Sequence, residues 1–245
     1  MTVIPESGLK NHGTERMDEE GFGMSSVLQP AANRFAVAMD RTARYPVDQT
    51  RFILGMLFLI IMCQGWLIFE KAINWDEFLH FGQIYELADG RLGSSIQTLP
   101  TRLFGWATLV SQDVVTQIQA IRFAMLACAV ITAVFVTILV RRFVSLQIAL
   151  VCGLVYLTAG FVFTNAFTYR TDPVAAAALM GALCVFAFGQ LSLARAAFVG
   201  ILVGFAGALT IKSVFYTPCF AAIAWLYWCR PDAKRLKLFG LFCTM

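Results

Sequence analysis

The chain has 245 residues, of which 59% are hydrophobic and 14% are charged, and its formal net charge is +4. Soluble domains carry about a quarter charged residues, so this composition, with a mean hydropathy of +0.71, excludes an ordinary soluble domain and indicates a membrane protein. No basic tract points to nucleic acid as a partner.

Residues 1–51 differ sharply from the rest of the chain. They are polar, contain several Gly and Pro residues, and lack the apolar core of a signal peptide. We therefore predict a disordered or surface-lying cytoplasmic tail, whose last part, residues 33–51, is suited to lie as a short helix on the membrane.

Long apolar runs follow the tail. A membrane-spanning helix needs about 20 apolar residues, and somewhat fewer where neighbouring helices assist. Residues 52–237 are therefore predicted to form a transmembrane module, and residues 238–245 to begin a truncated seventh span. The six predicted spans of the module are 52–69, 118–140, 146–167, 173–193, 196–211 and 214–229.

Polar side chains are few within these spans. No span carries a chain of ionisable groups through its centre, which argues against a proton pump, an ion channel or a secondary transporter. Gln64, Gln147 and Gln190 are predicted to form hydrogen bonds between spans. The seven cysteines lie in or beside apolar runs and are interpreted as packing residues.

The basic residues of the loops predict the orientation. With the amino terminus in the cytoplasm, eleven Lys and Arg residues fall inside and six fall outside, as the positive-inside rule requires. The short loop containing Arg141 and Arg142 and the segment 230–237 contribute most to this bias. The loop 70–117, the turn 168–172 and the region of Lys212 are then extracytoplasmic.

The first outer loop, 70–117, is predicted to contain a helix of its own. Asn74 is a suitable N-cap, Glu77 completes a capping box with it, and Gly90 suits the carboxyl-terminal stop. One face of this helix is apolar and the opposite face is polar, which predicts an amphipathic helix at the membrane interface. The apolar face comprises Phe78, Phe81, Tyr85 and Ala88, and the polar face comprises Asp76, His80 and Gln83.

Asp76 and Glu77 are candidate catalytic carboxylates. They lie in the first turn of the predicted helix, where free N–H groups and the helix dipole favour a negative charge, so Asp76 should be ionised and able to accept a proton. The same pattern also fits ordinary first-turn acids that stabilise a helix end. His80, one turn further on, is either a group that orients Asp76 or an interfacial histidine without a catalytic part.

Two further groups carry charge on the same side. Arg170 and Asp172 fill the tight turn before Pro173, and they fit either a phosphate-binding or metal-binding pair opposite Asp76 or an interfacial salt bridge. Lys212, after the fifth span, is placed either to meet a lipid-borne phosphate or to extend toward the interface as a lone lysine.

The order and sidedness of these features resemble the GT-C class of membrane glycosyltransferases, and within it the protein O-mannosyltransferase and lipid A aminoarabinose transferase branch. The likeness covers about residues 50–230 and includes the helix that runs to Gly90. Its motifs are Asn74-Trp75-Asp76-Glu77, Gln97-Thr98-Leu99-Pro100, Arg170-Thr171-Asp172 before the fourth span, and Lys212 after the fifth.

Members of this class transfer a sugar from a polyprenyl-phosphate carrier on the outer face of the membrane. The resemblance implies inverting transfer to a hydroxyl of a lipid, glycan or protein, with Asp76 as general base and Glu77 beside it as a second catalytic carboxylate. It implies that Arg170 and Lys212 bind the donor phosphate. Asp172 and His80 would position the acceptor or a divalent cation, although nothing in the sequence requires a metal.

Chains of this class are usually much longer, so the resemblance implies that this chain corresponds to the amino-terminal module alone. A second hypothesis comes from the residues themselves. It is a non-catalytic polytopic membrane protein, acting as a partner subunit or a binder of lipid head groups, in which Asp76 and Lys212 are interfacial anchors.

Overall fold

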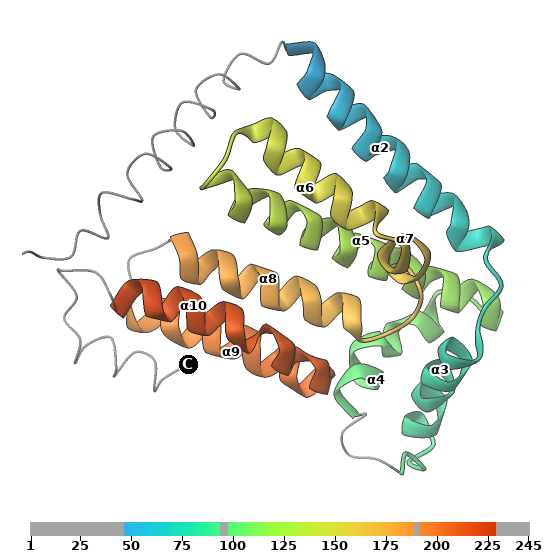
Figure 1. The fold of residues 1–245 in the computed structure, drawn as a ribbon. Coiled ribbons are helices and arrows are strands. Elements are labelled where there is room, and N and C mark those ends of the chain that lie inside the picture. The colour runs from blue at the N-terminus through green and yellow to red at the C-terminus, as the bar shows by residue number, and fades with distance from the viewer. Residues whose placement is uncertain (1–46, 94–97, 189–191, 229–245) are drawn as a thin grey trace, which may run out of the picture. The chain divides into compact units, whose positions relative to one another are not determined.

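The computed structural model describes residues 47–93, 98–188 and 192–228. The predicted tail up to residue 46, the motif residue Gln97, the predicted hydrogen-bonding residue Gln190 and the predicted seventh span 238–245 lie outside these ranges. The described part of the chain is helical and contains no strand (Figure 1). Its elements are α2 (Val47–Glu70), α3 (Trp75–Ala88), α4 (Thr98–Phe104), η3 (Gly105–Leu109), α5 (Val114–Arg141), α6 (Leu146–Thr158), α7 (Gly160–Asn165), α8 (Asp172–Phe188), α9 (Leu193–Leu209), η4 (Ile211–Tyr216) and α10 (Thr217–Trp228).

Two of the described helices are long and apolar enough to cross a membrane. They are Gln49–Glu70, which makes up nearly all of α2 and has 22 residues, and Val114–Arg141, which is α5 and has 28 residues. The predicted spans 52–69 and 118–140 lie inside them. The other predicted spans fall on shorter apolar helices: α6 with α7, α8, α9 and α10.

The prediction of one continuous helix over 146–167 is wrong. Ala159 adopts an extended conformation (φ −54°, ψ 127°) and separates α6 from α7. In an unbroken helix the Leu157 carbonyl would accept from the N–H four residues later. It accepts instead from Nε2 of Gln64 in α2, at 3.1 Å. The break is therefore supported by a neighbouring helix, which the local sequence does not reveal.

Helix α5 is the centre of the packing, because α2, α6 and α8 all lie against it, and α9 packs on α8 (Figure 1). The approach of α6 to α5 requires a glycine. A β-carbon on Gly153 would lie 2.5 Å from Oγ1 of Thr137. Gln147 of α6 also donates to Oγ1 of Thr50 in α2, at 3.3 Å, so Gln64 and Gln147 each form a hydrogen bond between helices, although Thr50 lies just outside the predicted span 52–69.

Helices α3 and α4 lie at the end of the bundle where α2 ends and α8 begins (Figure 1). A hydrophobic cluster joins them to α5 and to the segment before α8, and the side chains at its centre are almost completely buried. This cluster fixes α3 and α4 on the bundle. Its members are Phe81, Ile84, Phe104, Ala107, Ile118, Ile121, Met125 and Tyr169.

The buried face of α3 differs from the predicted apolar face. Glu77, Phe81, Gln83 and Ile84 are buried, whereas of the predicted apolar residues only Phe81 is. Glu77 can occupy the buried face because an arginine of α5 neutralises it. The opposite side of α3 therefore exposes large apolar side chains, among them Trp75, Phe78 and Leu79.

Candidate functional site

The amino-terminal turn of α3 places two adjacent carboxylates in different environments. Asn74 is the N-cap: its side chain accepts from Glu77 N at 3.1 Å, and its own N–H donates to Oε2 of Glu77 at 3.2 Å, which confirms the predicted capping box. The carboxyl-terminal stop at Gly90 is also confirmed, because Gly90 has a φ of +68° and follows the C-cap Asp89. Successive helix positions differ by about 100° in direction, so Asp76 points outward while Glu77 points inward.

Asp76 forms an ion pair with Arg170, and this is the first contact that unites predicted site residues. Nη2 of Arg170 lies 2.6 Å from Oδ2 of Asp76. The Asp76 side chain is 49% exposed and that of Arg170 is 30% exposed. The carboxylate is thus held by a cation and remains open to solvent, which is the condition for meeting an external hydroxyl group.

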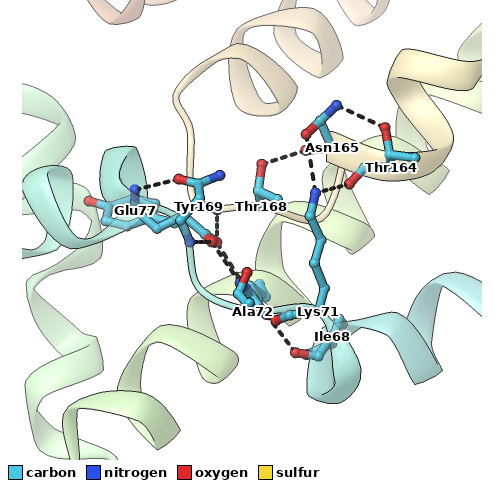
Figure 2. Close-up of polar contacts among 10 residues, drawn as sticks. Ile68, Lys71, Ala72, Glu77, Thr164, Asn165, Thr168 and Tyr169 are labelled. Carbon is cyan, nitrogen blue, oxygen red and sulfur yellow. Dashed lines mark hydrogen bonds and ion pairs between the residues drawn. The ribbon is translucent and has the colours of Figure 1, made fainter.

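Glu77 forms a second, buried ion pair with Arg122 of α5. The contact is bidentate, with Nε of Arg122 2.9 Å from Oε1 of Glu77 and Nη2 2.6 Å from Oε2. The two side chains are 0% and 1% exposed. Oε1 also accepts from the backbone N–H of Tyr169 at 2.9 Å, so this pair reaches the segment before α8 (Figure 2).

Arg122 also caps the carboxyl-terminal end of α2. Its Nη1 donates to the carbonyls of Ile68 and Lys71, each at 2.8 Å, and its Nη2 donates to the carbonyl of Ala72 at 3.3 Å. Figure 2 shows these three residues of α2 and its exit beside Glu77 and Tyr169. Carbonyls at a helix end lack intrahelical partners and favour a nearby positive charge. The Arg122 guanidinium supplies both the hydrogen-bond donors and the charge.

The surroundings of Glu77 keep it ionised. Burial raises the pKa of this carboxyl group, but the hydrogen bonds from Arg122 and from the N–H groups of Tyr169 and Asn74 outweigh burial, and the pKa lies below its ordinary value. Accepted hydrogen bonds stabilise the charged form of a carboxyl group.

Asp172 and Lys212 form the third ion pair. Nζ of Lys212 lies 2.7 Å from Oδ2 of Asp172, and Oγ1 of Thr210 lies 3.3 Å from Oδ1 of the same carboxylate. Lys212 is 63% exposed and Asp172 is 31% exposed. Both border a cavity of about 280 Å³, which is mainly apolar away from this pair. Its other lining residues are Phe161, Ala175, Ala176, Leu179, Thr210, Ser213, Phe215 and Tyr216.

The predicted site residues are therefore brought together as two half-exposed pairs at one end of the bundle. Asp76 with Arg170 and Asp172 with Lys212 are linked through the short segment 170–172. The cavity is lined by the second pair and not by the first. His80 lies edge-to-face against Tyr169, with ring centroids 6.0 Å apart, one helical turn from Asp76.

Lys71 is a further cation near the site, and its role was not apparent from the sequence. Its Nζ donates to the Thr164 carbonyl at 2.5 Å and to Oδ1 of Asn165 at 3.2 Å (Figure 2). The same Nζ lies 5.4 Å from the centroid of the Phe167 ring. Partial burial lowers the pKa of this ammonium group, with a smaller opposing effect from Glu77. Lys71 thereby ties the exit of α2 to the end of α7.

Metal ligation has no ready cluster in the part of the chain that the structure describes. No group of three or more His, Cys, Asp or Glu side chains there is arranged to hold a metal ion. Asp172 and His80, the residues predicted to position the acceptor or a cation, contact Lys212 and Tyr169 respectively.

The role of Arg122 was also not apparent from the sequence, where it is one of the six Lys and Arg residues counted as extracytoplasmic. A signal was present, because Arg122 lies inside the apolar run 118–140, where a charged side chain needs a partner.

Comparison with protein-family models, with curated proteins and with solved structures gave no match for the chain.

Proposed function

We propose that the chain is a polytopic membrane protein with glycosyltransferase chemistry. In this proposal it transfers a sugar from a polyprenyl-phosphate donor to an acceptor hydroxyl on the extracytoplasmic side, with inversion at the anomeric carbon. It acts as a catalytic module of the GT-C kind that the sequence resembles.

The surface of the helices supports the membrane part of the proposal. Only 11% of the apolar window of α2 is buried within the protein, and large side chains such as Phe52, Phe58 and Trp66 are exposed along it. A bilayer is the solvent in which such a surface is stable. We propose that α6 with α7, α8, α9 and α10 complete the set of spans, with the amino terminus in the cytoplasm.

The catalytic part of the proposal rests on Asp76, which lies in the first turn of α3. Its carboxylate is half-exposed and forms an ion pair with Arg170. In the proposed reaction the acceptor oxygen attacks the anomeric carbon, and its proton passes to Asp76. The bond from that carbon to the phosphate oxygen breaks, and its electron pair leaves with the phosphate. A general base must lie within hydrogen-bond reach of the acceptor proton, and the exposure of Asp76 allows this.

Arg170 and Lys212 are the proposed phosphate-binding groups. Each is now paired with an aspartate, so a donor phosphate would compete with Asp76 for Arg170 and with Asp172 for Lys212. Exchange of an exposed partner costs little, because exposed ion pairs contribute only about 0–1 kcal/mol. The apolar cavity beside Lys212 offers space for the part of the donor lipid nearest the phosphate.

Asp76→Asn tests the proposal. Membranes from cells producing the full chain are supplied with polyprenyl-phosphate sugars, and transfer to hydroxyl acceptors is measured. We expect Asp76→Asn to lower the rate by about 10²–10⁴-fold, the range that general-base catalysis supplies. Asp89→Asn is the matched control, because Asp89 is an exposed acid at the opposite end of α3 and is also paired with an arginine, Arg91. Equal rates in Asp76→Asn and the unmodified chain would remove the proposed base.

The second candidate function is a non-catalytic membrane protein that binds lipid head groups or a partner subunit. Its support is that Asp76, Arg170, Asp172 and Lys212 already neutralise one another, as interfacial anchors do. Joint replacement Asp76→Asn and Asp172→Asn separates the two functions. Absence of transfer by the unmodified chain, together with unchanged membrane insertion of the double variant, would favour the non-catalytic function, whereas transfer that is lost in the double variant with normal insertion would favour the enzyme.

A further inference from the structure

We infer that Glu77 and Arg122 are positioning residues, which hold the Asp76 carboxylate in place opposite Arg170. The inference rests on the proposed function, because it concerns the geometry of the base proposed there. It gives Glu77 a role other than proton transfer.

Glu77 has no acceptor site left for a substrate proton. A carboxylate offers about four lone-pair sites. Oε1 uses two of them for Arg122 Nε and Tyr169 N, and Oε2 uses the other two for Arg122 Nη2 and Asn74 N. Proton transfer to Glu77 would therefore break part of a buried network.

Arg122 is saturated in the same way. Its five N–H donors all have acceptors: two contacts reach Glu77, and three reach the carbonyls of Ile68, Lys71 and Ala72. A lysine has three donors on one nitrogen and cannot reproduce this planar fork. The guanidinium thus joins the exit of α2, the start of α3 and the body of α5 at one point.

The buried link lies next to the exposed link along both chain segments. Glu77 accepts from Tyr169 N, and their chain neighbours Asp76 and Arg170 pair outside. The exposed pair is too weak to fix two segments by itself. The inner link, together with the hydrophobic cluster that contains Phe81 and Tyr169, therefore holds the two backbones from which Asp76 and Arg170 project.

Kinetic measurements should then distinguish proton transfer to Asp76 from binding of the donor phosphate. Lys212 and Asp172 lie on η4 and α8 and make no contact with Glu77 or Arg122 among the hydrogen bonds and ion pairs of the described residues. Loosening the inner link should misplace the base, while Lys212 keeps its place for the donor phosphate. A loss that appears in kcat without KM indicates an interaction made only in the transition state.

Arg122→Lys is the informative variant, because it keeps the charge and removes the fork. We expect kcat to fall about 100-fold, the effect of a displacement of about 1 Å, with KM for the polyprenyl-phosphate sugar little changed. Tyr85→Phe is the matched control. It removes the 2.8 Å hydrogen bond from Tyr85 to Gln117, which ties the other end of α3 to α5. Equal losses of kcat in the two variants would overturn the inference.

A measurement without turnover separates this inference from the proposed function. Cysteines are placed at positions 76 and 170 in a chain whose seven native cysteines are replaced by alanine. With the outer charges gone, the inner link is the polar contact that holds the two segments together, and Arg122→Lys and Tyr85→Phe both leave the residues of the hydrophobic cluster unchanged. A short bis-thiosulfonate reagent should join the two cysteines several-fold more slowly when Arg122→Lys is added, and at the original rate when Tyr85→Phe is added.

The cross-linking rate tests the positioning role of Glu77 and Arg122, and the transfer rate of Asp76→Asn tests the proposed function. An unchanged cross-linking rate in Arg122→Lys overturns the positioning role, even if Asp76→Asn abolishes transfer. A slower rate supports the positioning role, even if Asp76→Asn retains full transfer and the proposed function falls.

Discussion

The pair Glu77–Arg122 and the pair Asp172–Lys212 use the same chemistry at the same end of the bundle, yet they differ in almost every physical respect. The first is buried, bidentate and saturated with hydrogen bonds from four chain segments, whereas the second is a single contact open to solvent. A buried charge is stable only while its partner remains, but an exposed charge can change partners. The comparison distinguishes a contact that holds chain segments together from one whose charged groups can exchange partners.

Removing one member of the buried pair should give the largest effect. Arg122→Leu leaves the Glu77 carboxylate buried without its cation and leaves three carbonyls of α2 and its exit without a donor. We expect a loss of about 3–5 kcal/mol in the free energy of unfolding, measured by denaturant titration in mild detergent. Arg141 is an exposed arginine at the far end of the same helix, and Arg141→Leu should lower the free energy of unfolding by less than about 1 kcal/mol. Similar losses in the two variants would contradict the assignment.

Acid should act on the same pair with an intermediate effect. The folded pKa of Glu77 is lowered from its ordinary value of about 4.5, so its contribution to stability is present above that pH and is lost as the pH falls through the folded value. We expect unfolding titrations from about pH 7 to about pH 3 to show stability falling below about pH 4.5. Glu77→Gln should start less stable and fall less steeply, and parallel curves would contradict the prediction.

The exposed pair should give the smallest effect on stability. Lys212→Met should change the free energy of unfolding by less than about 1 kcal/mol, because Lys212 is mostly solvated. The difference should vanish in about 1 M NaCl, where screening acts over about 3 Å. A loss in the free energy of unfolding that matched that of Arg122→Leu, or that persisted in salt, would show that the exposed pair stabilises the fold as the buried pair does.

Much of the described helical structure could be predicted from local features of the sequence. Hydropathy located α2 and α5, because each is a single apolar run bounded by polar residues. The ends of α3 were predictable because Asn74, Glu77 and Gly90 act through hydrogen bonds and φ angles within a few residues of one another. Asp76 was identified as a candidate by the same local reasoning, and its catalytic role stays a prediction.

The contacts that were missed are long-range. Glu77 and Arg122 are 45 positions apart, and their pairing places a charged residue on the buried face of α3, which an apolar pattern cannot anticipate. The break at Ala159 depends on Gln64, 93 positions before the carbonyl that it binds. The break has no local marker, because proline and a left-handed glycine are both missing from the turn at Ala159. The pair had half of one, because Arg122 lies inside an apolar run, but nothing local named Glu77 as its partner.

The contact of Gln64 with Leu157 has a consequence for biogenesis in the bilayer proposed above. An amide group and a carbonyl that lack partners in hydrocarbon each cost several kcal/mol, so α2 and α6 each carry this penalty until the two helices pack together. Docking of α2 alongside α6 gives the Gln64 Nε2 group and the Leu157 carbonyl a partner in each other, whereas Oε1 of Gln64 is buried without a partner among the described residues. The contact thus favours this order of helices over one in which both groups are left unpaired in hydrocarbon.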